Sequence, residues 1–322
     1  MASVVFTRGD HDESAHALAW CATGPDGEPA AASDADAGGF PVFPRSAAKP
    51  LQALPAVRAG VLERFGLGER HLALACASHG GTDGHVAVVA ETLAAVGMDE
   101  DDLGCGPLEP LFAPAAAALR AWGREPTRIV HNCSGKHALG LALCVHEGWD
   151  PRGYLEADHP LQQAMHAALA DAAVCRIEEV SHGTDGCGML AFRMPLRALA
   201  RAFGRLASGA LGPAGETVAR AMHAHPGLVA FPGGIDTELM VAEPGLVAKV
   251  GAEGVLALGL PDGRGAALKV LDGARRALDP AGVALAREVL GLAAAGAPLE
   301  ALARPVVANS RGDEVGAGEA RL

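Results

Sequence analysis

Short apolar runs with the length of β-strands lie near both ends of the chain, and longer amphipathic runs lie between them. The strand-like runs are bounded by Gly and Pro, which is typical of hairpin strands. They cover residues 4–7, 15–22, 238–241, 247–250, 255–260, 265–271 and a final pair within 306–321. Since strands far apart in a sequence can pair in one layer, the simplest arrangement is one antiparallel sheet built from both chain ends.

Helical periodicity dominates the middle of the chain, where apolar residues recur at intervals of three and four. The predicted helices cover residues 47–65, 85–96, 134–146, 160–173, 190–207 and 214–222, with a late one at 280–295. Pro50 is tolerated only in a first turn, so the first helix is expected to start near residues 47–49. Residues 72–77 form a short apolar stretch, and 24–39 and 99–114 are expected to be loops.

This alternation predicts an α/β protein of the α+β type. The sheet region is expected to cover about residues 1–45 and 224–322, and the mostly helical region about 46–223. We expect the two regions to act together as a single catalytic unit over residues 1–322.

The composition limits the classes of function. The chain has 322 residues, half of them hydrophobic, and a formal net charge of -12. Nucleic-acid binding needs a positive patch and no basic run is present, so we expect no nucleic-acid partner. No apolar run is long enough to span a membrane, and the charged N-terminus does not resemble a signal peptide. Seven cysteines, an odd number, indicate no disulfide framework, so we expect a reduced, cytoplasmic protein.

Lysine is scarce, and its placement is informative. Only 4 of the 26 basic residues are lysine, so arginine serves wherever a generic positive charge is enough. A lysine can lose its proton when desolvated and then act as a base or ligand, whereas arginine cannot. Lys49, Lys136 and Lys269 lie in distinctive motifs, and we interpret Lys249 as incidental.

The first candidate pair is Ser46 and Lys49. Residues three apart lie on one helix face, so the hydroxyl and the amine can meet, and a neutral lysine can accept the serine proton. Lowering a lysine pKa from about 10.4 towards 7 requires roughly 4 to 5 kcal/mol, which burial and a neighbouring cation can supply. The alternative is a helix-capping Ser46 and a solvated Lys49.

A second pair comes from distant parts of the chain. Hydrolases with the β-lactamase layout combine a helix-start Ser-x-x-Lys, a second serine and a late-strand lysine. Ser78 and Lys269 follow Ser46 and Lys49 in that order, and can relay a proton to a leaving nitrogen. The alternatives are a turn serine bonded to its own backbone and a surface lysine.

The third group of candidate residues contains cysteines. Cys133 and Lys136 lie at a helix start, and Cys187 lies on a glycine-rich turn, so two thiolates can bind zinc with a further ligand and a water. The alternative is that the cysteines are small buried hydrophobes. Four histidines flank these motifs, and His137 is the first candidate for orienting a substrate. They are His79, His131, His137 and His182.

Taken together, these motifs resemble the rhizobial-type, or class 3, L-asparaginases of the asparaginase II family. The resemblance covers nearly the whole chain, and the run HNCSGKH followed by DGCG is its most specific part. The matching segments are residues 13–16, 43–52, 77–79, 131–137, 158–160, 185–188 and 224–226.

The resemblance implies hydrolysis of L-asparagine to L-aspartate and ammonia, a fold similar to serine β-lactamases and glutaminases, and a homodimer. It implies Ser-Lys tandems at Ser46 with Lys49 and Ser78 with Lys269. It also implies a zinc site that supports substrate binding more than it supplies the nucleophile.

The implied zinc ligands are Cys133, Lys136 and Cys187. Arg45 and Asp185 match positions near the substrate, where they suit its α-carboxylate and α-ammonium groups respectively. Three alternatives stay open: a zinc-dependent amidohydrolase that uses metal-bound water, a glutaminase-like enzyme, and a non-catalytic metal-binding protein.

Overall fold

The structure is a computed structural model that describes residues 2–322. The chain forms two compact units. Unit 1 contains residues 1–47, 193–210 and 233–322, and unit 2 contains residues 48–192 and 211–232. The expected division into a sheet region and a helical region, and their action as a single catalytic unit, stay predictions.

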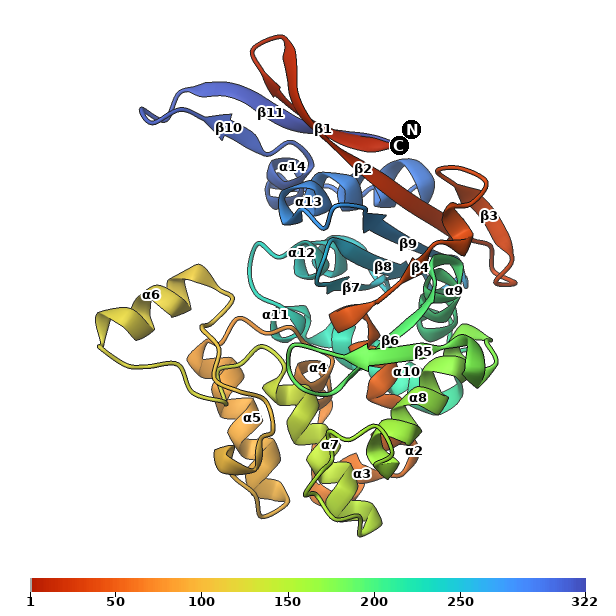
Figure 1. Ribbon diagram of the computed structural model, residues 1–322, viewed down its shortest axis with the longest axis vertical. Coiled ribbons are helices and arrows are strands. Elements are labelled where there is room, and N and C mark those ends of the chain that lie inside the picture. Colours follow the sequence, from red (N-terminus) through yellow and green to blue (C-terminus); the bar gives the residue numbers. More distant parts are fainter. Residues whose placement is uncertain (1) are drawn as a thin grey trace. The chain divides into compact units, whose positions relative to one another are not determined.

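Unit 1 is built on one antiparallel sheet (Figure 1), with strand order β10-β11-β1-β2-β9-β8-β7 and β3 paired to β2. The first strand pairs with the last, Ser3 opposite Arg321, which confirms a sheet made from both chain ends. The strands are β1 (Ser3–Arg8), β2 (His11–Thr23), β3 (Pro29–Ala32), β7 (Val247–Gly251), β8 (Val255–Gly259), β9 (Gly265–Val270), β10 (Val306–Ala308) and β11 (Glu314–Arg321).

Helices cover both faces of this sheet. A Cβ on Gly259 would lie 2.0 Å from the Phe203 carbonyl oxygen, so glycine lets α9 (Leu196–Ala207) pack closely against β8. Leu256 points to the opposite face, where it meets Gly282 of α13 (Arg275–Ala284). Unit 1 also contains α12 (Ile235–Ala242) and α14 (Ala297–Ala303).

Unit 2 is mostly helical. Its centre is α7 (Ser134–Glu147), in which every residue from Ser134 to Cys144 is buried. The other helices are α1 (Lys49–Gln52), α2 (Leu54–Arg58), α3 (Val61–Phe65), α4 (Glu69–Ala75), α5 (Asp83–Ala95), α6 (Ala113–Ala121), α8 (Pro160–Ala173), α10 (Gly212–Ala224) and α11 (Pro226–Val229). Strand β5 (Ser181–Thr184) neighbours β6 (Leu190–Pro195), which leads into unit 1.

Three predicted elements are wrong. The run at residues 238–241 is part of helix α12, because a short apolar run does not by itself distinguish a buried helix from a strand. The helix predicted from residue 190 begins as strand β6, and Pro195 marks the change to α9. The long helix predicted to residue 65 is broken into α1, α2 and α3, with Gly60 in a left-handed conformation at φ 80°.

Two further segments differ from expectation. Residues 72–77 lie largely within helix α4, and the loop expected at residues 99–114 is followed by helix α6, which the periodicity did not predict. The predicted strands at 247–250, 255–260 and 265–271 are confirmed as β7, β8 and β9.

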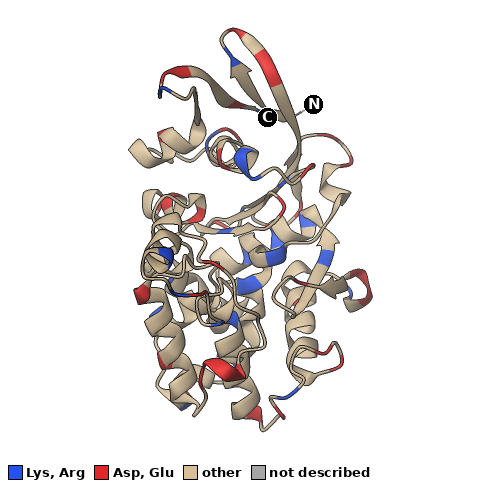
Figure 2. Ribbon diagram, turned by 60° about the vertical axis from the view of Figure 1, so that its left-hand side comes forward, with Lys and Arg blue, Asp and Glu red and all other residues tan. Residues whose placement is uncertain are grey.

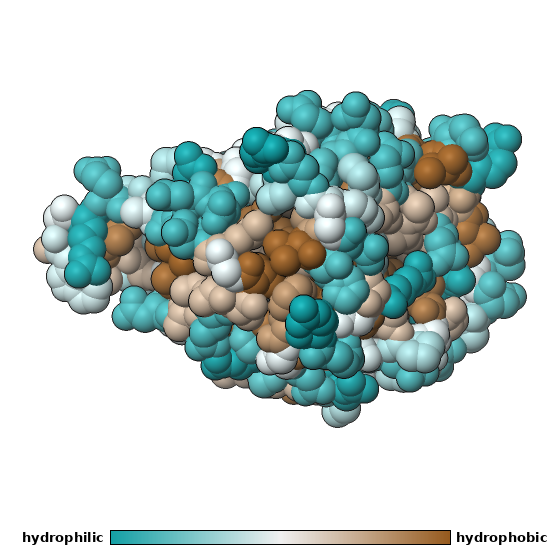
Figure 3. All heavy atoms as spheres, turned by 90° about the horizontal axis from the view of Figure 1, so that it is seen from below, coloured by the Kyte–Doolittle hydropathy of each residue, from teal (hydrophilic) through white to brown (hydrophobic). Residues whose placement is uncertain are grey.

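The surface is mixed in character. Figure 2 shows basic residues distributed over several elements of both units, among acidic ones. In the view of Figure 3, hydrophilic side chains surround a smaller area of hydrophobic ones. Within residues 2–322, no helix combines the length and the hydropathy needed to cross a membrane.

Candidate active site

Lys49 is the most enclosed of the predicted catalytic residues. It is the first residue of α1, and its side chain is buried with 1% relative exposure. Its Nζ atom donates to the carbonyl oxygens of Ala77 and Asn132, the latter at 3.2 Å, and lies 3.3 Å from Ser78 Oγ. The structure therefore joins Lys49 to Ser78, a contact that the sequence analysis did not predict.

Ser46 lies in the turn that leads into α1. The turn is a 3-10 helix (Arg45–Ala48), held by a 3.0 Å hydrogen bond from Ala47 N to the Pro44 carbonyl oxygen. Ser46 and Arg45 are both half-buried. Arg45 has φ 53°, a left-handed conformation that costs energy in a non-glycine residue and often marks a functional turn.

The turn after Ser78 is held tightly within unit 2. Ser78 N donates to the Val229 carbonyl oxygen at 3.0 Å. A Cβ on Gly80 would lie 2.7 Å from Phe112 Cβ, so only glycine allows this approach without a shift. A cavity of about 370 Å³ borders the turn, and neither Lys49 nor Ser78 lines it. The turn is therefore rigid at the point where it presents Ser78.

The two lysines at the helix starts of unit 2 are close together. Lys49 and Lys136 both line one small cavity of about 10 Å³, which is close to the size that one water needs. Lys136 is also buried, and its Nζ lies 3.2 Å from Cys187 Sγ.

The Cys187 thiol lies in a charged cluster. The hydrogen bond from Cys133 lowers the pKa of Cys187 well below its usual range, burial opposes this, and the charge of Lys136 adds to the lowering. The same hydrogen bond, together with burial, raises the pKa of Cys133 well above its usual value. The two thiols therefore share one hydrogen bond, and the charge of Lys136 favours a thiolate at Cys187.

The pKa of Lys136 depends on the same groups. Burial lowers the pKa of Lys136, but its interactions with Cys187, Cys133 and Asp185 outweigh burial and raise the pKa overall. Asp185 is half-buried in a turn closed by a 2.8 Å hydrogen bond from its N–H to the Met189 carbonyl oxygen. The predicted residues Cys133, Lys136, Asp185 and Cys187 thus come together in one cluster.

The histidines near these groups are mostly buried and neutral. His137 bonds through Nδ1 to Tyr154 Oη at 2.6 Å, and burial lowers its pKa. Burial lowers the pKa of His131 to about 4 and that of His79 well below the usual range. His182 is exposed.

The sequence profile of the L-asparaginase II family matches residues 4–320, nearly the whole chain. The chain belongs to the L-asparaginase II family. It is therefore an amidohydrolase of the L-asparaginase type. A search of curated proteins finds no match.

Membership in this family makes the thiol cluster the place to test for zinc. In a tetrahedral zinc site the Zn–S distance is about 2.3 Å and the Zn–N distance about 2.0 Å. A sulfur and a nitrogen bound to the same zinc therefore lie roughly 3.5 Å apart. Lys136 Nζ and Cys187 Sγ are 3.2 Å apart, so they fit within a few tenths of an ångström. Within residues 2–322 no group of three His, Cys, Asp or Glu side chains has the arrangement of a metal site, so the lysine amine is essential to the predicted set.

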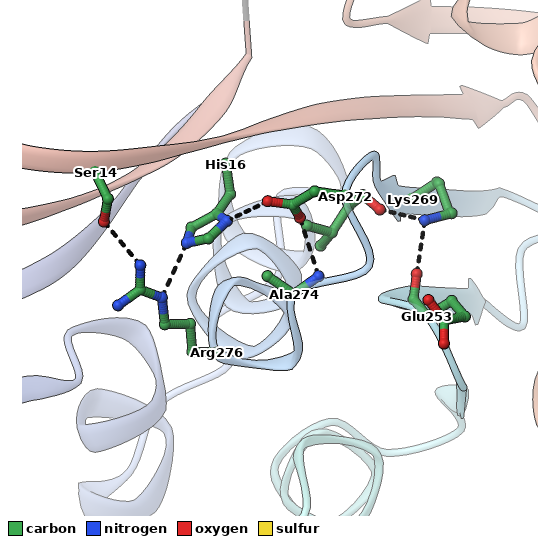
Figure 4. Close-up of polar contacts among 8 residues, drawn as sticks. Ser14, His16, Glu253, Lys269, Asp272, Ala274 and Arg276 are labelled. Carbon is green, nitrogen blue, oxygen red and sulfur yellow. Dashed lines mark hydrogen bonds and ion pairs between the residues drawn. The ribbon is translucent and has the colours of Figure 1, made fainter.

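Lys269 occupies a different setting from the one predicted. It lies on β9 in unit 1, half-buried, and donates to the Glu253 carbonyl oxygen at 2.7 Å and to the Val270 carbonyl oxygen (Figure 4). Burial lowers its pKa, against the charges of Glu253 and Asp272. Ser78 and Lys269 belong to different units, and their pairing stays a prediction.

Lys249, which the sequence analysis interpreted as incidental, occupies a buried site in unit 1. Its side chain is fully buried on β7, with 0% relative exposure, and its Nζ lies 2.7 Å from Asp236 Oδ2. One signal was available, because Lys249, Val250 and Gly251 have the Lys-x-Gly spacing of the K-T-G strand motif in penicillin-recognising serine enzymes.

Proposed function

We propose that the protein hydrolyses L-asparagine to L-aspartate and ammonia through a serine activated by Lys49, beside a zinc site. The observation that carries this proposal is the contact of the buried Lys49 amine with Ser78 Oγ at 3.3 Å, with Ser46 in the turn immediately before Lys49. A buried amine within reach of a hydroxyl is the arrangement that activates a serine nucleophile.

In the proposed reaction, Ser46 Oγ attacks the side-chain amide carbon and Lys49 accepts its proton. Collapse of the tetrahedral intermediate breaks the C–N bond, and ammonia leaves with a proton supplied through Ser78. Water then hydrolyses the aspartyl ester and Ser46 recovers its proton. Ser46 is preferred to Ser78 as the nucleophile because it lies at the start of a helical segment, where developing negative charge is favoured.

A second lysine is proposed to act beside Ser46. Lys269 was the residue expected to work with Ser78, but Lys249 is better supported by its surroundings. A Cβ on Gly251 would lie 2.1 Å from the Pro44 carbonyl oxygen, so β7 runs directly against the segment that contains Ser46. Lys249 lies two residues before Gly251, on the same face of the strand.

The other predicted residues have supporting roles. Arg45 suits the α-carboxylate of the substrate and Asp185 its α-ammonium group, because opposite charges make strong hydrogen bonds. Cys133, Lys136 and Cys187 would hold zinc, with Lys136 bound as the neutral amine after losing its proton. When bound, zinc would supply a positive charge that organises the substrate-binding residues.

The proposal is tested by ammonia release from L-asparagine and L-glutamine, with and without added zinc. We expect release from L-asparagine and its loss in Ser46→Ala, while the circular dichroism spectrum is unchanged. Ser78→Ala should retain a slow covalent step, which mass spectrometry can detect as an aspartyl adduct on Ser46. An adduct on Ser78 in Ser46→Ala would reverse the two serine roles, and near-normal activity in both variants would refute the mechanism.

A further inference from the structure

The Lys249–Asp236 pair stands out among the ion pairs of the described residues. Both side chains are almost inaccessible to solvent, with 0% and 4% exposure, whereas each of the other recorded pairs includes a side chain that is at least one-fifth exposed. Burying two charges is costly and is often no better for stability than an apolar pair. A pair retained in such a place therefore suggests a role for the charge itself.

Asp236 lies where a negative charge is stabilised. It is in the first turn of α12, where the helix dipole favours a negative charge. Its Oδ2 atom accepts a 2.7 Å hydrogen bond from Lys249 Nζ and a 3.3 Å hydrogen bond from Val250 N. Both donors belong to β7, so the carboxylate holds the strand and the lysine head group together.

The strand that carries Lys249 packs against the segment that contains Ser46. Gly251, on the same strand face as Lys249, packs against Pro44, which is two residues before Ser46. A buried ammonium held by a carboxylate remains charged, because loss of its proton would leave the carboxylate buried without a partner. Lys249 thus differs in role from Lys49, whose described contacts include a serine hydroxyl and two carbonyl oxygens.

We propose that Asp236 is a positioning residue that keeps Lys249 cationic next to Ser46, so that Lys249 stabilises developing negative charge and does not act as a base. This inference rests on the proposed function, since it assigns a role within the same serine reaction. A fixed positive charge near the attacking oxygen acts on the transition state more than on bound substrate, so it should affect kcat more than KM.

The experiment compares four variants in the ammonia assay. Asp236→Asn, which keeps an acceptor for Val250 N but removes the charge, should lower kcat about 100-fold with KM little changed. Asp236→Glu should recover part of kcat. The double variant Asp236→Asn with Lys249→Met removes both charges, so it should regain thermal stability but not kcat. Asp262→Asn is the control, a carboxylate of unit 1 paired with Arg264, and should keep normal kcat.

A direct measurement on wild-type protein tests the inference even where the variants fail to fold. The chain has only four lysines, so ¹⁵Nζ labelling of wild-type protein gives a simple spectrum, and Lys249→Met identifies the signal. An ammonium signal for Lys249 at neutral pH is expected, and a neutral amine would overturn the inference. Normal kcat in Asp236→Asn or in the double variant would also overturn it. Wild-type protein that releases no ammonia from any amide would refute the proposed function instead.

Discussion

Lys49 Nζ lies 3.3 Å from Ser78 Oγ, which links the first residue of α1 to the turn that follows α4. The two residues are separated by 29 positions in the sequence, and each had been assigned to a different Ser-Lys tandem. Their contact means that Lys49 is within reach of a proton exchange with Ser78. The pairing of Lys49 with Ser46 stays a prediction.

Replacing Lys49 with arginine should abolish activity. Arginine keeps the positive charge but cannot release its proton near neutral pH, so it cannot accept the serine proton. Because general-base catalysis contributes about 10² to 10⁴-fold, we expect kcat for L-asparagine to fall by at least 100-fold. The matched control is Arg58→Lys on α2, an exposed residue paired with Asp171, which should leave kcat unchanged. Wild-type kcat in Lys49→Arg would exclude Lys49 as the base.

Removing a thiol from the proposed zinc site should affect metal content and substrate binding together. In Cys187→Ala the site loses a proposed ligand, so bound zinc should fall to background and KM for L-asparagine should rise at least tenfold. Metal analysis and steady-state kinetics measure the two effects. Cys175→Ala, which changes a partly exposed cysteine, is the control and should retain the metal. Full zinc content in Cys187→Ala would remove this residue from the predicted ligand set.

Stability should fall as the pH decreases below about 6.5, the usual pKa of histidine. Burial, with the charges of His85 and Lys49, holds the pKa of His79 well below that value. The folded state therefore leaves His79 neutral where the unfolded state binds a proton, and acid favours unfolding. Urea unfolding at a series of pH values measures this slope, which should be shallower in His79→Gln. His182→Gln, at an exposed site, should leave it unchanged, and an identical slope in His79→Gln would contradict the assignment.

The glycine after His79 should be intolerant of a side chain. The Cβ of Gly80→Ala would lie 2.7 Å from Phe112 Cβ and 3.1 Å from Phe231 Cβ, so the turn that carries Ser78 must shift. We expect a loss of about 1 to 3 kcal/mol in unfolding free energy and a clear fall in kcat. Gly84→Ala is the control, because a Cβ on Gly84 of helix α5 would meet only Thr82 Oγ1, at an ordinary 3.8 Å, and the variant should gain stability. Equal changes in unfolding free energy and kcat in the two variants would show that packing at Gly80 does not hold the turn in place.

The sequence by itself determined the family and most of the fold. Alternating strand-like and helical runs were enough to predict the sheet from both chain ends, because periodicity reports which face of an element is buried. The thiol, lysine and serine motifs were recognisable because their residue types and local spacing are unusual. Short segments such as residues 238–241 could not be assigned, since four apolar residues fit a buried helix or a strand equally well.

Only the tertiary structure decided which distant groups meet. Burial separates Lys249 from Lys269, because the first is fully buried against Asp236 and the second is half-buried against backbone carbonyls. Likewise, the contacts of Lys49 with Ser78 and of Lys136 with Cys187 depend on how helices pack. Burial and the proximity of charges set the chemistry of a lysine or a thiol, and both arise from packing between segments far apart in the chain.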